Sequence, residues 1–199
     1  ISSRLEHHAV LHTIDNLLKY NNITVEFVNL DEKGNIDLAH LEALLSDTSQ
    51  RTLVSLMHAN NEIGNMIDLE VVGALCEKYG ALFHTDTVQT MGYYPINVQA
   101  AKVHYLNGSA HKFYGPKGVG FVFISGDAML KPFIDGGAQE RNMRGGTENL
   151  HSIVGMSLAL DLAYTQLAER QAHIKELKEY LKAQLLANFA DIYFIGDTE

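Results

Sequence analysis

The 199-residue sequence contains a single cysteine, Cys76, and no tryptophan. One cysteine can form neither a disulfide framework within the chain nor a cysteine-based zinc site. Basic residues are also few: lysine and arginine number 15 against 24 aspartates and glutamates, and the formal net charge is -9. Because no basic cluster offsets this charge, the composition argues against a nucleic-acid partner and against binding to an anionic membrane.

Long hydrophobic runs are missing as well. No apolar stretch reaches the length needed to span a bilayer, and the first residues do not resemble a signal peptide. With 46% hydrophobic and 20% charged residues, the sequence is typical of a globular protein with a buried core, expected in the cytoplasm. The sequence starts at Ile1 and stops after the strand-like "DIYFIGD", so we expect a fragment of a longer protein.

Short runs rich in β-branched and aromatic residues alternate with segments of helical periodicity. The pattern predicts strands at 23–30, 51–58, 81–86, 102–109 and 118–125, and helices at 36–46, 69–80 and throughout most of 148–188. Such alternation predicts an α/β fold with a mostly parallel, doubly wound sheet. We expect a domain boundary inside the last helical segment, which divides a large domain (1–165) from the start of a smaller one (166–199).

Polar residues follow three of the predicted strands: "HANN" at 58–61, "HTD" at 84–86 and "SAHK" at 109–112. Ligands of open parallel sheets bind at the carboxyl ends of the strands. We therefore expect these three segments to converge on one binding site.

Lys112 is the central candidate residue. Most lysines are solvated surface residues, but this one directly follows a strand and has His111 beside it. A lysine amine that is partly desolvated near cationic groups becomes a nucleophile toward aldehydes. Ser109 and His111 can donate to phosphate oxygens. Together these residues predict an aldehyde cofactor that carries a phosphate, which is pyridoxal 5'-phosphate.

Such a cofactor needs a carboxylate that keeps its ring nitrogen protonated. Asp86 can supply it, although an aspartate in this position can equally be a helix cap or a solvated loop residue. Gln89, three residues later, can donate to the phenolic oxygen of the ring. Asp86 and Lys112 are separated by about one strand–crossover–strand unit, which predicts neighbouring strands.

Two further positions also have a structural alternative. His7 opens a helical pattern, so it is either the cap of that helix or an imidazole that stacks on the cofactor and exchanges protons. Asn61 lies in an asparagine-rich stretch, which also favours a simple turn. His8 and His12 have the spacing of zinc ligands on a helix, but no third ligand accompanies them, so we predict no metal site.

The blocks "SLMHANNEIG", "FHTDTVQTMG", "SAHKFYGPKGVG" and "GGAQERNMRGGTEN" resemble the successive signature motifs of the cysteine desulfurases. These are class V aminotransferase-like enzymes of the fold-type I group that depend on pyridoxal phosphate. The resemblance extends from Ile1 to Glu199. It implies a homodimer that converts L-cysteine to L-alanine and passes persulfide sulfur to acceptors such as an iron–sulfur scaffold.

The resemblance also implies a role for each candidate residue. Lys112 bonds to the cofactor aldehyde and later moves the substrate's protons, and His7 stacks on the ring. The remaining implied contacts are Asp86 to the ring nitrogen, Gln89 to the phenolic oxygen, Ser109 and His111 to the phosphate, Asn61 near the cofactor and the substrate carboxylate, and Thr147 to the phosphate of the other subunit's cofactor.

Two family features have no match in this sequence. The family's N-terminal phosphate-binding turn would precede Ile1, and its catalytic cysteine would follow Glu199. Cys76 does not match that cysteine, and its helical setting predicts a buried hydrophobic residue instead. A selenocysteine lyase, another class V enzyme, or a non-catalytic dimerising or scaffold domain therefore stand as alternatives.

Overall fold

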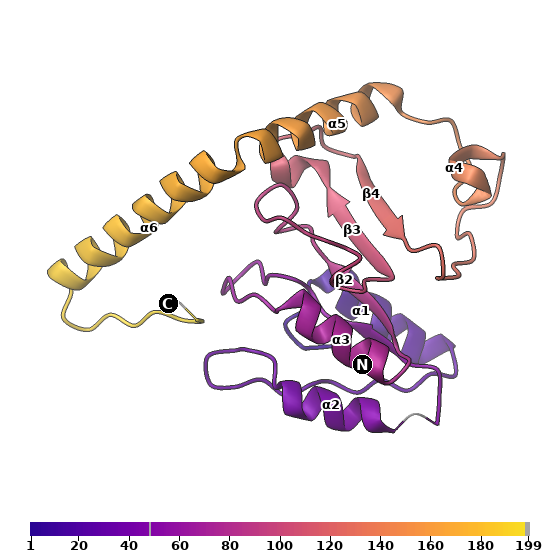
Figure 1. The fold of residues 1–199 in the computed structure, drawn as a ribbon, viewed down its shortest axis with the longest axis horizontal. Coiled ribbons are helices and arrows are strands. Elements are labelled where there is room, and N and C mark those ends of the chain that lie inside the picture. Colours follow the sequence, from indigo (N-terminus) through magenta and orange to yellow (C-terminus); the bar gives the residue numbers. More distant parts are fainter. Residues whose placement is uncertain (48, 198–199) are drawn as a thin grey trace.

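The computed structural model describes residues 1–47 and 49–197. Its centre is a four-stranded sheet in the order β1-β2-β3-β4 (Figure 1). The strands are β1 (Leu53–Ser55), β2 (Leu82–Asp86), β3 (Tyr105–Ser109) and β4 (Gly120–Ile124). The first three run parallel, and β4 pairs antiparallel with β3. The expected α/β class with a mostly parallel sheet is confirmed.

The N-terminal residues extend the sheet beyond β1. The main-chain N–H of Ser55 donates to the carbonyl of Ile1 at 2.9 Å, and Ser2 forms a parallel bridge with Phe27. The prediction of a strand at 23–30 was wrong, because only single bridges form there. Residues 21–26 lie mostly exposed. Their apolar side chains therefore have no neighbouring element to pack against, and strand pairing does not extend through this segment.

The strand predicted at 51–58 is shorter than expected but keeps its hydrogen bonds. Beyond β1, the main-chain N–H of Leu56 donates to the carbonyl of His84, and that of His58 donates to the carbonyl of Asp86. The extended backbone therefore follows β2 to its end. This pairing carries the loop after residue 58 to the same sheet edge as Asp86.

The helices are α1 (His8–Tyr20), α2 (Leu38–Ser46), α3 (Leu69–Lys78), the short α4 (Gln139–Asn142), α5 (Leu150–Thr165) and α6 (Leu167–Asn188). Helices α2 and α3 begin at aspartate N-caps: the Asp37 side chain accepts the main-chain N–H of His40, and Asp68 accepts those of Glu70 and Val71. Each cap satisfies main-chain donors that the first helical turn leaves without partners.

The long C-terminal helical segment is broken at Gln166, where φ is −101° and ψ is 10°. Helix α6 then projects away from the sheet (Figure 1), and none of its residues is buried. The break falls beside the expected boundary at residue 165. The division into two domains stays a prediction.

The core lies between the sheet and α3. Val54, Phe83 and Leu106 come from three adjacent strands and are at most 2% exposed. Cys76 of α3 is fully buried against them, and burial raises the pKa of its thiol to about 12. The expectation that Cys76 is a buried hydrophobic residue is confirmed. No helix among the described residues is both long and apolar enough to cross a membrane.

Candidate active site

Asp86 is the last residue of β2 and is only 7% exposed. Its Oδ1 atom accepts two hydrogen bonds, from the main-chain N–H of Val88 at 2.9 Å and from Nδ2 of Asn107 at 3.1 Å. Because both bonds end on Oδ1, Oδ2 remains available as an acceptor. A buried carboxylate held in this way is suited to a fixed cationic partner.

Lys112 lies in the 3₁₀ turn η1 (Ala110–Phe113), which directly follows β3. This turn repeats every three residues, so Ala110 and Phe113 face the same side, and both are fully buried. His111 and Lys112 lie between them and are exposed. Two apolar anchors thus present the Lys112 amine at the carboxyl end of the strand, as the sequence predicted for its position.

The turn after β2 packs closely against η1. Gly92 has a φ of 79°, and a Cβ atom built on it would lie 2.9 Å from Cβ of Phe113. A side chain at residue 92 would therefore both strain the backbone and push the lysine-bearing turn away. Glycine at this position allows the two turns to lie against each other at the sheet edge.

Ser109 and His111 flank the start of the same turn. The Ser109 hydroxyl and Nδ1 of His111 lie 3.0 Å apart. His111 is exposed and Ser109 is half-buried, so both polar groups are within reach of a ligand at the end of β3. Their assignment to a phosphate stays a prediction.

His7 is the N-cap of α1, and its Nδ1 accepts the main-chain N–H of Ala9 at 3.1 Å. The structural alternative considered for this histidine is therefore present. The cap fixes the ring and leaves Nε2 for other contacts, so the expected stacking role stays a prediction. His7 and Asn61 line one cavity of about 330 Å³, which brings these two predicted residues together.

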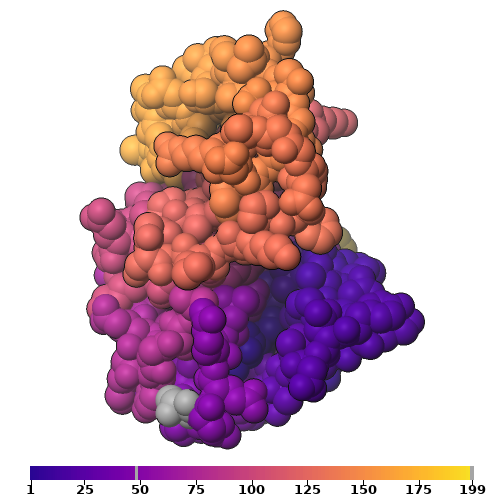
Figure 2. Space-filling model, turned by 90° about the vertical axis from the view of Figure 1, so that its right-hand side faces the viewer, coloured from indigo at the N-terminus to yellow at the C-terminus, as the bar shows by residue number. Residues whose placement is uncertain are grey.

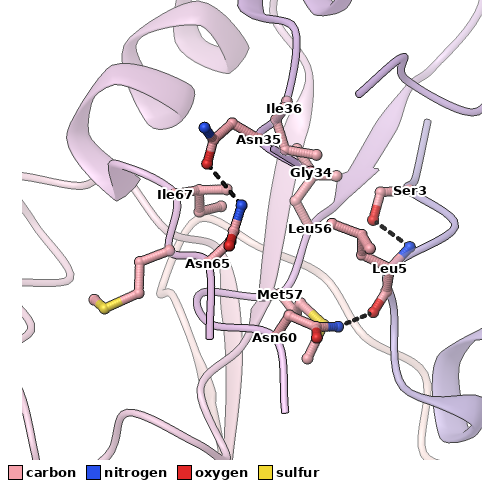
Figure 3. A pocket seen from close by; sticks show the side chains of 11 residues that line it. Ser3, Leu5, Gly34, Asn35, Ile36, Leu56, Met57, Asn60, Asn65 and Ile67 are labelled. Atoms are coloured by element: carbon pink, nitrogen blue, oxygen red, sulfur yellow. Dashed lines mark hydrogen bonds between the residues drawn. The ribbon is translucent and has the colours of Figure 1, made fainter. Parts of the chain in front are cut away.

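Asn60 holds the segment before α1 in place beside that cavity. Its Nδ2 donates to the carbonyl of Leu5 at 2.7 Å, and Ser3 Oγ accepts the N–H of Leu5 (Figure 3). A small adjoining cavity of about 20 Å³ lies among these residues. The sequence marked "HANN" as a site segment, but here Asn60 has the structural role and Asn61 is exposed.

Glu6 is a buried acid that the sequence analysis did not single out. It is 3% exposed, its Oε1 accepts the main-chain N–H of Met57 at 2.6 Å, and its buried Oε2 has no hydrogen-bond partner among the described residues. Burial raises the pKa of Glu6 to about 7, and the nearby charge of Asp86 contributes. Its position directly before His7 was the only available signal.

The other two predicted residues are less closely tied to the site. Gln89 is half-buried in the turn after β2, three residues beyond Asp86. Thr147 is exposed in the segment between α4 and α5, which lies above the N-terminal part of the chain (orange and indigo in Figure 2). Within the described part of the chain, no hydrogen bond or ion pair joins Thr147 to another predicted site residue.

This site has the outline of an α/β enzyme whose ligand groups gather at the carboxyl ends of parallel strands. The sequence profile of class-V aminotransferases matches residues 1–199. The chain therefore belongs to the class-V aminotransferase family. The resemblance inferred from its motifs is confirmed at this level.

Relatives and solved structures support the same family. The chain is 40% identical to the cysteine desulfurase IscS of Dictyoglomus turgidum over 98% of this chain and 49% of that protein. It is 36% identical to the cysteine desulfurase NifS of Azotobacter vinelandii, over 100% of this chain and 49% of that protein. A solved NifS-like protein superposes with a TM-score of 0.89 at 38% identity, covering 94% of this chain and 51% of the other.

A structure described as SspA in complex with cysteine superposes with a TM-score of 0.74 at 32% identity, over 80% of this chain and 46% of the other. The chain spans about half the length of the curated relatives it matches.

Proposed function

We propose that the protein is a cysteine desulfurase that depends on pyridoxal phosphate and converts L-cysteine to L-alanine. One observation carries the proposal. Asp86, a buried carboxylate, and Lys112, an exposed amine, stand at the carboxyl ends of the adjacent parallel strands β2 and β3. Cysteine is proposed as the substrate because the relatives are named cysteine desulfurases.

The residues present fit the proposed cofactor. Asp86 offers Oδ2 as an anionic acceptor for a protonated ring nitrogen, because its hydrogen bonds within the protein end on Oδ1. Lys112 offers an amine for the aldehyde, and Ser109 and His111 offer donors for the phosphate. Gln89 is the proposed partner of the phenolic oxygen.

Pyridoxal phosphate supplies an electron sink for the negative charge that develops on the substrate's α-carbon. Asp86 keeps the ring nitrogen positive, which makes that sink effective. Lys112 takes the α-proton of cysteine and returns protons on the way to alanine. His7 and Asn61 line the cavity of about 330 Å³, whose lining does not include Asp86 or Lys112, and in the proposed function they bind and orient the substrate.

The thiol that accepts sulfur must reach both the substrate and an acceptor protein. Cys76 cannot do this, because it is fully buried and its thiol pKa is raised to about 12, so it is a poor thiolate donor. We propose that a thiol other than Cys76 takes the sulfur as a persulfide. The proposed acceptors are sulfur-carrying proteins such as an iron–sulfur scaffold in the cytoplasm, where free thiols persist.

We also propose that the protein is a homodimer with shared sites. Thr147 is exposed, and it lies in a glycine-flanked segment three residues before the start of α5. A hydroxyl and main-chain N–H groups near a helix start can bind phosphate. In the proposed dimer, Thr147 contacts the phosphate bound by the partner subunit.

The proposed activity is tested by incubating the protein with pyridoxal phosphate, L-cysteine and an added thiol that can accept the sulfur, and measuring alanine. Asp86→Asn should bind the cofactor but form alanine at least about a hundredfold more slowly, because an amide cannot keep the ring nitrogen protonated. The matched control Asp135→Asn changes an exposed loop carboxylate and should leave the rate unchanged. Alanine formation by Asp86→Asn at the wild-type rate would contradict the proposed site.

A further inference from the structure

Four polar side chains form one continuous line across three adjacent strands. Ser55 Oγ lies 2.8 Å from Nδ1 of His84, and Nε2 of His84 lies 3.0 Å from Oδ1 of Asn107. Asn107 Nδ2 then donates to Oδ1 of Asp86 at 3.1 Å. We call Ser55, His84 and Asn107 the Asp86 relay.

The strand register produces this line. Ser55 lies opposite His84 in the pairing of β1 with β2, and Asp86 lies opposite Asn107 in the pairing of β2 with β3. Side chains two residues apart on a strand share a face, so His84 and Asp86 project on the same side of the sheet. The relay therefore depends on the register of the rigid parallel strands and not on a loop.

The direction of every hydrogen bond in the relay follows from Asp86. An ionised carboxylate only accepts hydrogen bonds, so the Asn107 amide must turn its NH₂ group toward Asp86. The amide oxygen then faces His84 and requires a donor there. The proton of the imidazole must consequently be on Nε2.

The Ser55 hydroxyl completes the relay. Burial lowers the pKa of His84, so the ring is neutral at neutral pH. A neutral imidazole that carries its proton on Nε2 has an acceptor at Nδ1, and the Ser55 hydroxyl donates to it. The hydrogen bonds of the relay therefore all donate in one direction, from Ser55 through His84 and Asn107 to Oδ1 of Asp86.

We propose that Asn107 and His84 are positioning residues that fix the orientation of the Asp86 carboxylate toward the cofactor's ring nitrogen. This inference rests on the proposed function. It adds two residues that act through Asp86 and contact neither cofactor nor substrate. Without Asn107, the main-chain N–H of Val88 is the one hydrogen-bond partner left to the carboxylate among the described residues, so the carboxylate can rotate away from its productive orientation.

Two titratable groups lie near Asp86, one from the segment before α1 and one from β2 itself. Glu6, from the segment before α1, is the buried acid whose pKa is raised in part by the charge of Asp86. His84 lies on β2 itself; burial lowers its pKa, and the hydrogen bond to Asn107 and the charge of Asp86 oppose that lowering. Both groups therefore face the same carboxylate.

The first test needs no cofactor. Long-range ¹H–¹⁵N NMR of the uniformly ¹⁵N-labelled protein reports which nitrogen of each histidine ring carries the proton. At neutral pH, His84 should be the Nε2–H tautomer, and Asn107→Leu should abolish that preference because the acceptor is gone. A wild-type His84 that is protonated on Nδ1 alone would overturn the relay.

The second test measures cofactor binding by absorbance titration with pyridoxal phosphate over a range of pH. Asn107→Leu should weaken binding about tenfold or more and shift the pH profile of the bound cofactor's absorbance. Asn107→Ser, which keeps a donor and an acceptor, should recover part of both effects. The control Asn97→Ala, which removes an amide that binds only main-chain N–H groups, should change neither.

The outcomes separate the two proposals. If the wild-type protein does not bind pyridoxal phosphate, the proposed function fails and the positioning role fails with it, whatever the tautomer of His84. If the wild type binds and Asn107→Leu binds equally well with an unchanged pH profile, only the positioning role is wrong. Should Asn107→Leu not fold, His84→Ala replaces it: loss of the ring frees the Asn107 amide from its second partner, so cofactor binding should weaken and its pH profile should shift, and unchanged binding with an unchanged profile would overturn the proposal.

Discussion

The hydroxyl of Tyr93 donates a hydrogen bond to the main-chain carbonyl of Lys112 over 3.0 Å. The turn after β2 therefore holds the turn after β3, which carries the proposed nucleophilic amine. Arg170, near the start of α6, places its guanidinium 4.9 Å from the ring of Tyr93 and 5.0 Å from that of Tyr114. These contacts connect α6 to the backbone of Lys112.

Tyr93→Phe removes only the hydroxyl. We expect it to lower the free energy of unfolding by about 1 kcal/mol, because one hydrogen bond is lost while the ring and its contact with Arg170 remain. Urea unfolding at neutral pH measures this change. Tyr180→Phe, on the exposed surface of α6, is the control and should have no effect. Equal stability of Tyr93→Phe and the wild type would show that the bond contributes nothing.

Glu6 should make the stability fall as the pH rises. Its pKa is about 7 in the folded protein, and the ordinary value, which applies to the unfolded chain, is 4.5. The folded state therefore holds the proton more strongly than the unfolded state. The stabilisation is complete below pH 4.5 and is lost as the pH rises through 7. Glu6→Gln should remove this dependence, which amounts to roughly 3 kcal/mol.

The measurement is urea unfolding of both proteins at several pH values. His58 changes stability in the opposite direction: burial lowers its pKa to about 4, so its contribution is lost as the pH falls from 6.5 through 4. Subtracting the Glu6→Gln curve from the wild-type curve cancels His58. If the difference in unfolding free energy between the two proteins stayed constant from pH 4.5 to 8, the pKa of Glu6 would not be raised in the folded protein.

Cys76→Ala tests whether the only cysteine of the chain has a structural role. The side chain is fully buried in α3, so we expect a loss of about 1 kcal/mol from the vacated volume. With an added thiol as the sulfur acceptor, alanine formation from cysteine should continue at the wild-type rate. Loss of that activity with unchanged stability would make Cys76 the sulfur-accepting thiol.

The proposed sharing of sites predicts complementation between two inactive variants. Thr147→Ala should weaken cofactor binding about tenfold or more through the loss of a hydrogen bond to a charged phosphate, and Lys112→Ala should abolish covalent attachment. A mixed dimer of the two variants has one site that contains both Lys112 and Thr147. Co-expression should therefore restore one tight site per dimer, measured by bound cofactor.

If Lys112 and Thr147 of one subunit belonged to the same cofactor site, the mixed dimer would contain no intact site. Tight binding would then fail to reappear, which would exclude the shared arrangement. A dimer mixed from wild type and Lys112→Ala is the control and should bind one cofactor in either case.

The sequence predicted the positions of residues at strand ends better than the contacts of residues within strands, and the roles of the predicted site residues stay predictions. Asp86 and Lys112 were predictable because a polar residue after an apolar run marks a strand end. Asn107 was not, because its role depends on the register that places it opposite Asp86. Glu6 was also missed, since the loop from residue 57 buries it through tertiary contacts that no local pattern encodes.

The element boundaries show the same limit. The helices α2 and α3 followed from their caps and periodicity, which are local properties. The segment 23–30 has the composition of a strand, yet only Phe27 and Leu30 form bridges within it. Strand formation needs a partner over its whole length, and the sequence alone does not give the length of that contact.

Covalent attachment of pyridoxal phosphate to Lys112 is the most direct test of the proposed function. The protein is incubated with the cofactor, reduced with borohydride, digested and analysed by mass spectrometry, with Lys112→Ala and Lys117→Ala treated in parallel. We expect the modification on the peptide that contains Lys112, its retention in Lys117→Ala and its loss in Lys112→Ala. Modification at Lys117 instead, or no modification of the wild-type protein, would contradict the account.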